Sequence, residues 1–356
     1  MTGRPGSFQP ACVLVTGGAG FIGSNLIRWI LSEQPRVQVV NLDLLTYAGN
    51  LESLEDVAHD ARYRFVHGDI GDRELVARLL AGDGGPPPDA VLHLAAESHV
   101  DRSILGPAVF VETNVRGTLS LLEATRAELE RMSRPFRFLQ VSTDEVYGTL
   151  GTAEPAFTEA TPLAPNSPYA ASKAGADHLV HAYVATFGFP AIITRCANNY
   201  GPYQFPEKLI PLMITRALRD EALPVYGDGL QVRDWIHVDD HARALWTVLT
   251  CGVQGEVYNI GGEIQVPNIE IVRTILRHLG KGEALIRHVP DRAGHDRRYA
   301  MNAARLRTEL DWTPRHTLED GLGTTVTWYV EHRTWWERVI SEAYRAAAAL
   351  YLAERA

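Results

Sequence analysis

The stretch TGGAGFIG, residues 16–23, lies between a run of apolar residues, CVLVT, and an amphipathic segment, FIGSNLIRWILSE. It spaces Gly17, Gly20 and Gly23 as GxxGxxG. Glycine is needed where a strand turns tightly into a helix, where backbone approaches a pyrophosphate and where the helix packs on the strand. The N–H groups and the positive dipole end of that helix then face the phosphates. The stretch therefore predicts a strand, a phosphate-binding turn and a helix that begin a dinucleotide-binding fold.

The alternation of strands and helices continues through the first half of the chain. Further strands are expected in VQVVNLD, YRFVHGD, AVLHLA, FRFLQVS and AIITR. The helical segments between them are DRELVARLLA, VFVETNVRGTLSLLEATRAELERM and SPYAASKAGADHLVHAYVATF. Near-continuous apolar strands that alternate with helices form a parallel sheet covered on both faces. We therefore predict an α/β fold with a Rossmann-type, doubly wound parallel sheet.

After about residue 195 the pattern changes. NNYGPYQFPEKLIP is rich in proline, glycine and aromatic residues, and it leads into a helix, PLMITRALRDE. The segment VYGDGLQVRDWIHVDD, a helix HARALWTVLTC and a strand EVYNIGG follow. This pattern indicates a smaller, interleaved α/β C-terminal lobe that binds substrate. We assign residues 11–195 to the Rossmann domain, which about 238–262 rejoin, residues 196–237 and 263–335 to the lobe, and residues 336–356 to a C-terminal helix.

Composition restricts the class of protein. The 356 residues are 46% hydrophobic and 22% charged, as in ordinary globular proteins. The net charge of −9 argues against nucleic-acid binding, which needs a basic surface. No apolar run approaches the ~18 residues of a membrane span, and the three cysteines have no metal-ligand spacing. We expect a cytoplasmic protein with neither nucleic acid nor membrane as partner and with no metal.

Two aspartates at strand ends extend the dinucleotide site. Asp43 ends the second expected strand, where a carboxylate accepts hydrogen bonds from the adenosine ribose hydroxyls. Its charge repels a 2′-phosphate, so NAD is favoured over NADP. Asp69, at the end of the third strand, is expected to meet the adenine edge. The other residues that we expect to bind the cofactor are Phe21, Ile22, Leu44, Thr46, Ile70, Leu94, Ala95, Ala96, Ser98, Thr113, Tyr169, Lys173 and Asn199.

The segment SPYAASK puts a phenol and an ammonium on one helix face. Ser167 as N-cap and Pro168 at the first helical position predict a helix start, and Tyr169 and Lys173 are then one turn apart. A nearby positive charge favours the phenolate, so we expect Lys173 to lower the pKa of Tyr169 from ~10. Tyr169 is thus the candidate base that takes a proton from an alcohol. Thr143 is expected to hydrogen-bond the same substrate oxygen.

These features together resemble the extended short-chain dehydrogenase/reductase family. Longer motifs are similar to its dTDP-glucose 4,6-dehydratase branch, namely LDLLTYAGN, HLAAESHVDRSI, STDEVYG, ANNYGPYQFPEKLIP, VYGDGLQVRDWIHVDDH and PDRAGHDRRYA. They extend from about residue 11 to about residue 335. The resemblance implies NAD-dependent oxidation of C4 of dTDP-glucose, loss of water across C5 and C6, and hydride return to C6, which gives dTDP-4-keto-6-deoxy-glucose.

The same resemblance explains why STDEVYG carries two adjacent acids. A C5 proton is acidic once C4 is a ketone, and Glu145 is the candidate base that removes it. The C6 hydroxyl leaves only when protonated, and Asp144 is the candidate acid. A neighbouring carboxylate and a dry pocket should raise the pKa of Asp144. Because interacting acids titrate as a pair, the division of roles between the two stays open.

The second lobe is expected to hold the nucleotide diphosphate of the sugar substrate. Arginine is the fork-shaped donor that suits diphosphate oxygens. The residues expected to bind substrate are Ser98, Thr143, Asn198, Asn199, Lys208, Leu209, Pro224, Tyr226, Arg233, Asn268, Arg292, His295 and Tyr299. Family members are usually homodimers through two long helices, here about 109–132 and 167–187.

Two other readings stay open from the sequence. The first is another nucleotide-sugar enzyme of this family, such as a UDP-sugar 4-epimerase or a UDP-glucuronate decarboxylase; such an epimerase needs no acid–base pair aimed at C5 and C6. The second is a non-catalytic NAD-binding protein, which would be expected to lose Tyr169 or Lys173. Preference for thymidine or uridine also stays open, since one methyl contact is worth about 1–3 kcal/mol.

Overall fold

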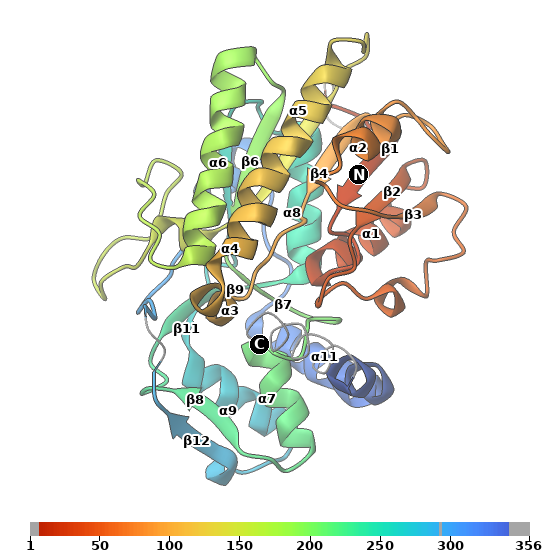
Figure 1. The fold of residues 1–356 in the computed structure, drawn as a ribbon. Coiled ribbons are helices and arrows are strands. Elements are labelled where there is room, and N and C mark those ends of the chain that lie inside the picture. Colours follow the sequence, from red (N-terminus) through yellow and green to blue (C-terminus); the bar gives the residue numbers. More distant parts are fainter. Residues whose placement is uncertain (1–6, 292–293, 342–356) are drawn as a thin grey trace.

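A parallel sheet forms the centre of the fold in the computed structural model, which describes residues 7–291 and 294–341 (Figure 1). It has seven strands in the order β10-β6-β5-β4-β1-β2-β3. Their bounds are β1 (Cys12–Thr16), β2 (Gln38–Asp43), β3 (Tyr63–His67), β4 (Ala90–His93), β5 (Arg137–Thr143), β6 (Ala191–Cys196) and β10 (Val257–Ile260). The strand order reverses at β1, and in such sheets ligands bind outside the carboxyl ends of the strands at the reversal. The predicted fold class is therefore confirmed.

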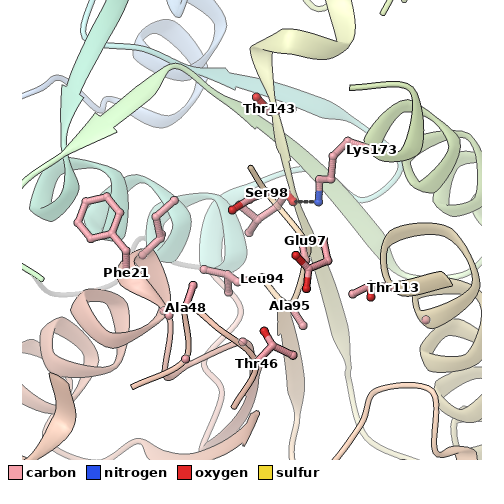
Figure 2. A pocket seen from close by; sticks show the side chains of 18 of the residues that line it. Phe21, Thr46, Ala48, Leu94, Ala95, Glu97, Ser98, Thr113, Thr143 and Lys173 are labelled. Atoms are coloured by element: carbon pink, nitrogen blue, oxygen red, sulfur yellow. Dashed lines mark hydrogen bonds between the residues drawn. The ribbon is translucent and has the colours of Figure 1, made fainter. Parts of the chain in front are cut away.

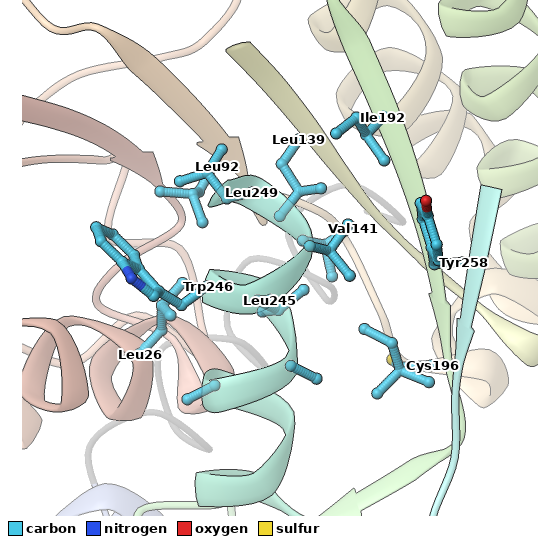
Figure 3. Packing of buried hydrophobic residues seen from close by; sticks show 14 of the residues in the cluster. Leu26, Leu92, Leu139, Val141, Ile192, Cys196, Leu245, Trp246, Leu249 and Tyr258 are labelled. Atoms are coloured by element: carbon cyan, nitrogen blue, oxygen red, sulfur yellow. The ribbon is translucent and has the colours of Figure 1, made fainter. Parts of the chain in front are cut away.

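Helices cover both faces of this sheet. One face carries α1 (Phe21–Glu33) and α8 (Val238–Cys251), and the other carries α2 (Arg73–Leu80), α5 (Thr118–Leu129) and α6 (Pro168–Phe187). Leu26 of α1 and Leu245 and Leu249 of α8 pack against Leu92 and Leu139 of the sheet (Figure 3). Each such leucine contributes roughly 1.5–3 kcal/mol of burial free energy. This packing keeps the carboxyl edge of the sheet in place, where the functional side chains lie.

The segment expected as one helix over 109–132 is helical without interruption as far as Leu129, but its hydrogen-bonding pattern changes along the way. It forms a short helix, α4 (Pro107–Phe110), a π-helical stretch, η2 (Val111–Gly117), and then α5. A Cβ at Gly117 would lie 2.8 Å from Cδ1 of Ile70, so the helix approaches its neighbour too closely for a side chain there. Within η2 the side chain of Asn114 bonds the backbone of Glu97 at both its N–H and its carbonyl oxygen. These tertiary contacts are made within the π-helical stretch, and π-helical turns often lie at functional sites.

The second lobe packs below the carboxyl edge of the sheet (Figure 1). It contains a three-stranded sheet, β11-β9-β7, and a two-stranded sheet, β12-β8. Their bounds are β7 (Asn198–Tyr200), β8 (Leu223–Tyr226), β9 (Val232–His237), β11 (Gln265–Pro267) and β12 (Ile286–Val289). The helices of this part of the chain are α7 (Leu209–Leu218), α9 (Asn268–His278), α10 (Ala304–Leu310) and α11 (Leu318–Glu331). Short helical turns occur at η1 (Leu51–Leu54), α3 (Val100–Leu105), η3 (Asp144–Tyr147) and η4 (Glu283–Leu285).

Two boundaries differ from the pattern. Helix α8 begins at Val238, before the expected HARALWTVLTC, because the side chain of His237 accepts a hydrogen bond from Asp239 N and caps the earlier turn. The expected C-terminal helix over 336–356 falls largely outside the described residues from 342 onward. Within the described ranges, no helix has the length and apolar character needed to cross a membrane.

Candidate active site

A cavity of about 510 Å³ opens along the carboxyl edge of the sheet. Figure 2 shows Phe21, Thr46 and Leu94 on one part of its wall and Thr143 and Lys173 on another. All five predicted catalytic residues line this cavity, and so do all the predicted cofactor residues: Gly17, Gly20, Phe21, Ile22, Gly23, Asp43, Leu44, Thr46, Asp69, Ile70, Leu94, Ala95, Ala96, Ser98, Thr113, Tyr169, Lys173 and Asn199. Cavities of this size hold cofactors and small substrates.

The glycine turn makes one wall of the cavity from backbone. Gly17 has φ of +72°, and a Cβ there would lie 2.6 Å from the backbone nitrogen of Ala95. A Cβ at Gly23 would lie 2.2 Å from the carbonyl oxygen of Gly17. Neither position accepts a side chain, so the start of α1 stays open to a ligand. Because the first N–H groups of a helix lack partners within the helix, this wall fits the pyrophosphate of a dinucleotide.

Asp43 is held at the end of β2 by two backbone hydrogen bonds. Its Oδ2 accepts from Ala19 N and its Oδ1 accepts from Leu45 N, both at 2.8 Å. Each carboxylate oxygen can accept a second bond, so acceptor capacity for ribose hydroxyls remains. Burial raises the pKa of Asp43, and the two N–H bonds oppose that shift. Asp69 lies in the adjacent turn, where Oδ1 accepts from Gly71 N at 2.7 Å.

Helix α6 carries the phenol and the ammonium. The Ser167 side chain accepts a hydrogen bond from Ala170 N at 3.1 Å, which confirms the predicted cap and fixes the helix start. The ammonium of Lys173 donates to the carbonyl oxygen of Val141 on β5 at 2.8 Å. Burial lowers the pKa of Lys173, and the charge of Asp177 opposes that shift.

The expected direction of the Tyr169 pKa shift is wrong. Burial raises the pKa of Tyr169 well above its usual value, and the charge of Glu145 raises it further. The reason is that the phenol is buried and lies near the carboxylates of Glu145 and Asp144, and these effects outweigh the one expected from Lys173. A hydrogen bond with Thr143 acts in the opposite direction and favours the phenolate.

The two acids lie on a short 3₁₀ turn at the end of β5. Thr143 caps this turn, because its Oγ1 accepts from Glu145 N at 3.3 Å and donates to Asp144 Oδ1 at 3.2 Å. Asp144 is 2% exposed, and its Oδ2 is buried with no hydrogen-bond partner among the described residues. Burial raises the pKa of Asp144 well above its usual value, and the charges of Glu145 and Asp234 add to the effect. The predicted direction is thus confirmed, and the carboxyl group favours its protonated form.

The predicted substrate residues divide into two groups. Ser98, Thr143, Asn198, Asn199 and Lys208 line the cavity. Those that do not line it are Leu209, at the start of α7, Pro224 and Tyr226 on β8, Arg233 on β9, Asn268 at the start of α9, His295 and Tyr299. Arg292 lies outside the described residues.

Arg233 and Tyr299 form a buried unit beside the acids. The Arg233 guanidinium lies 4.2 Å from the centre of the Tyr299 ring and donates to the carbonyl oxygens of Val232 and Asp296. The Tyr299 hydroxyl donates to Asp296 Oδ2 at 2.5 Å. Nη1 and Nη2 of Arg233 are thus directed at backbone oxygens.

Two of the predicted substrate residues have a buried amide oxygen that remains available, and one of them, Asn198, lines the cavity. Asn198 Oδ1 and Asn268 Oδ1 have no hydrogen-bond partner among the described residues. Leaving a buried acceptor unpaired costs about 1–3 kcal/mol, so both oxygens suit a polar ligand. Lys208, by contrast, donates to the carbonyl oxygen of Ser98 at 2.9 Å.

Sequence reasoning missed several cavity residues. Glu97, Tyr47, Phe205 and Glu207 line it, and an arginine outside it joins two of them. The Arg102 guanidinium lies 3.7 Å from the centre of the Tyr47 ring and 3.0 Å from Glu207 Oε2. Glu97 and Glu207 directly precede Ser98 and Lys208, so adjacency to predicted positions was the available signal. The segments that contain Glu97 and Glu207 come together only in the folded chain.

One group of side chains in the described chain has the composition of a metal site. His237, Asp239 and His316 bring possible ligand atoms within 4.8 Å of one another. The two imidazole rings stack with centres 4.1 Å apart and planes at 26°. The lone pair of a ring nitrogen lies in the ring plane, so near-parallel stacked rings do not direct two nitrogens at one ion. We therefore assign no metal to this group.

Comparison with known proteins distinguishes the possible families. The sequence matches the family described as GDP-mannose 4,6 dehydratase over residues 14–325. It is 54% identical over 348 residues to a dTDP-glucose 4,6-dehydratase of Neisseria meningitidis serogroup B, covering 94% of this chain and 97% of that protein.

Solved structures also separate the dehydratases from the epimerases. A dTDP-glucose 4,6-dehydratase from Streptomyces venezuelae, crystallised with NAD, has a TM-score of 0.87 and 50% identity over 92% of this chain and 99% of that one. A UDP-glucose 4-epimerase from Thermus thermophilus has a TM-score of 0.80 but only 29% identity, over 90% of this chain and 99% of that one. The epimerase shares the fold, whereas the dehydratases also share half or more of the residues, which confirms the resemblance and NAD as cofactor. The chain therefore belongs to the dTDP-glucose 4,6-dehydratase family.

Proposed function

We propose that this protein converts dTDP-glucose to dTDP-4-keto-6-deoxy-glucose with NAD as a recycled cofactor. One observation carries the proposal: Asp144, buried and with a raised pKa, and its neighbour Glu145 share a single cavity with Tyr169 and Lys173. An alcohol oxidation alone needs only the second pair. Elimination of water needs an acid and a base in addition, and the first pair supplies them.

The glycine turn and the end of β2 hold the cofactor in this proposal. The turn offers backbone N–H groups to the pyrophosphate, and Asp43 accepts from the ribose hydroxyls. Bound NAD supplies the oxidant and the reductant of the cycle, and its positively charged nicotinamide favours the phenolate form of Tyr169.

Tyr169 and Thr143 act on the C4 hydroxyl. The phenolate takes the hydroxyl proton while Thr143 holds the same oxygen, and general bases of this kind contribute roughly 10²–10⁴-fold. Lys173, buried on the same face of α6, supplies the positive charge that the phenolate needs.

Glu145 and Asp144 then remove water. With C4 a ketone, Glu145 takes the C5 proton and Asp144 gives its proton to the C6 hydroxyl as that group leaves. The burial that raises the pKa of Asp144 keeps this proton in place near neutral pH. Glu145 returns its proton to C5 at the end of the cycle, and the proton that Tyr169 took from the C4 hydroxyl replaces the one that Asp144 lost with the water, so all three groups are restored.

The second lobe binds the nucleotide. Lys208, Asn198 and Asn199 lie on the cavity wall nearest to it, and the unpaired oxygen of Asn268 suits a ribose hydroxyl or a base N–H. Arg233 binds the diphosphate when its guanidinium gives up its hydrogen bonds to the two backbone carbonyl oxygens. The division into a Rossmann domain and an interleaved lobe, with 238–262 in the first, belongs to the same proposal.

The protein forms a homodimer in the cytoplasm in this proposal. Apolar side chains are exposed on the two helical segments predicted to pair, namely Val109, Val111, Leu119 and Phe187, each at least 38% exposed. Such a patch favours burial in a partner interface. Three free cysteines, two of them buried, fit a reducing compartment.

One assay across dTDP-, UDP-, GDP- and CDP-glucose tests the function. We expect the dTDP sugar to give a 4-keto-6-deoxy product, detected by its base-induced ultraviolet absorbance, without net formation of NADH. Epimerised sugar with intact C6 hydroxyl, or no reaction with any of the four, would contradict the proposal.

A further inference from the structure

A buried arginine lies behind the cavity and contacts two different elements of the site. Arg195 on β6 is 6% exposed. Its Nε donates to Asp177 Oδ2 at 2.9 Å, and its Nη1 donates to the Tyr147 hydroxyl oxygen at 3.0 Å. The Tyr147 hydroxyl in turn donates to Asn259 Oδ1 at 2.7 Å. None of these four residues lines the cavity, so none touches substrate or cofactor.

Each partner of Arg195 belongs to one half of the chemistry. Asp177 lies on α6 one turn beyond Lys173, and side chains one turn apart share a helix face. Its charge opposes the loss of the Lys173 proton that burial promotes. Tyr147 ends the η3 turn that carries Asp144 and Glu145. One guanidinium therefore connects the oxidation pair to the elimination pair.

We infer that Arg195 is a positioning residue that holds the Asp144–Glu145 turn against α6 through Tyr147 and keeps Lys173 charged through Asp177. The inference rests on the proposed function. A planar guanidinium is suited to this task because its fixed fork serves two acceptors in two directions, which the single ammonium of lysine does not. Desolvating the Arg195–Asp177 pair is costly, so its presence behind the site calls for such a role.

The two connections have separable consequences. Loss of the Tyr147 hydroxyl frees the end of η3, so the acids lose their alignment while Tyr169 and Lys173 keep theirs. Loss of the Asp177 charge acts on Lys173 instead. The charged and titratable groups that act on Lys173 or are acted on by it are Asp177 on the same helix, Cys196 on β6 and His93 on β4, while Tyr169 and the two acids of η3 line the same cavity. Among these charge effects, that of Asp177 opposes the loss of the Lys173 proton most.

Tyr147→Phe tests the first connection, with Tyr258→Phe as matched control. Tyr258 is also buried, and its hydroxyl makes two hydrogen bonds, to Glu309 and from Val253 N, but it does not line the cavity or contact η3 through them. With dTDP-glucose we expect Tyr147→Phe to slow water loss roughly tenfold, which corresponds to about 1.4 kcal/mol of activation free energy. The rate of C4 oxidation should stay within about twofold of the wild-type rate. The readouts are accumulation of NADH during one turnover and slowed exchange of the C5 proton in deuterated solvent.

Arg195→Lys and Asp177→Asn test the second connection. We expect Arg195→Lys to repeat the slow water loss of Tyr147→Phe but to keep the pH profile of C4 oxidation, because an ammonium still faces Asp177. We expect Asp177→Asn to move the alkaline limb of that profile to lower pH, because Lys173 loses its proton more easily without the carboxylate.

The outcomes separate this inference from the function on which it rests. Equal effects of Tyr147→Phe and Tyr258→Phe on both steps and on melting temperature, or an unmoved pH limb in Asp177→Asn, overturn the inference alone. A wild-type protein that forms no 4-keto-6-deoxy sugar overturns the proposed function and the inference together.

Discussion

Asp144→Asn separates the two halves of the proposed reaction. The amide has nearly the shape of the carboxyl group but gives no proton to a leaving hydroxyl. In the folded protein Asp144 favours its neutral form, and its Oδ2 has no partner among the described residues, so the exchange removes neither a charge nor a bond of that oxygen. At a pH below the unfolded value near 3.8, where this carboxyl group is neutral in both the folded and the unfolded chain, we therefore expect a change of no more than about 1 kcal/mol in the free energy of unfolding. Water loss should slow by roughly 10²–10⁴-fold, the contribution of a positioned acid.

Rapid mixing with dTDP-glucose distinguishes the steps. C4 oxidation still proceeds in the variant, so NADH absorbance should rise at the wild-type rate and persist, while the 4-keto-6-deoxy product appears slowly. Asp89→Asn is the matched control, because Asp89 accepts from Ala11 N at the opposite edge of the sheet and does not line the cavity. Product formation at the parent rate in Asp144→Asn, with no lasting NADH, would show that Asp144 is not the acid.

Further changes test the pH dependence, the first oxidation, the cofactor wall and the helix start. A carboxyl group whose folded pKa is raised contributes its full stabilisation below the unfolded pKa near 3.8, and this contribution is lost as pH rises through the folded pKa. The stability of Asp144→Asn relative to wild type, measured by urea titration, should therefore increase with pH. A difference that does not change with pH would refute this. Tyr169→Phe should suppress NADH formation by roughly 10²–10⁴-fold in the same mixing experiment, with Tyr258→Phe unaffected. Gly17→Ala puts a Cβ 2.6 Å from Ala95 N at a φ of +72°, so the purified variant should lose its bound NAD; a full complement of NAD after dialysis would contradict the described turn. Ser167→Ala removes the cap of α6 and should cost about 1 kcal/mol in urea unfolding, whereas Ser32→Ala, on an exposed part of α1, should cost little.

Much of the fold follows from local sequence patterns. The start of α1 at Phe21 follows from the glycine turn before it, and the start of α6 follows from Ser167 and Pro168. These signals come from residues that are neighbours in the sequence, so they do not depend on the tertiary structure. The π-helical stretch η2 is different, because within it Gly117 lies against Ile70 and Asn114 bonds Glu97, contacts between segments that sequence spacing does not bring together.

The site shows the same limit. The raised pKa of Asp144 could be predicted because one of its causes, Glu145, is its neighbour in the chain. The Tyr169 prediction failed because burial, the largest cause of the raised pKa, arises only when the chain folds around the phenol. Glu97 and Glu207 were missed for a similar reason, since Arg102 and Tyr47 join their segments only in the folded chain.

The tight winding of η3 points the side chains of the two neighbouring acids in different directions. A 3₁₀ turn has three residues per turn, so consecutive side chains diverge by roughly 120°. Asp144 consequently points inward, 2% exposed, while Glu145 is left more accessible. In the proposed reaction, side chains that leave the backbone in such different directions serve different carbons of one hexose, and a single inserted residue would rotate the pair and undo that arrangement.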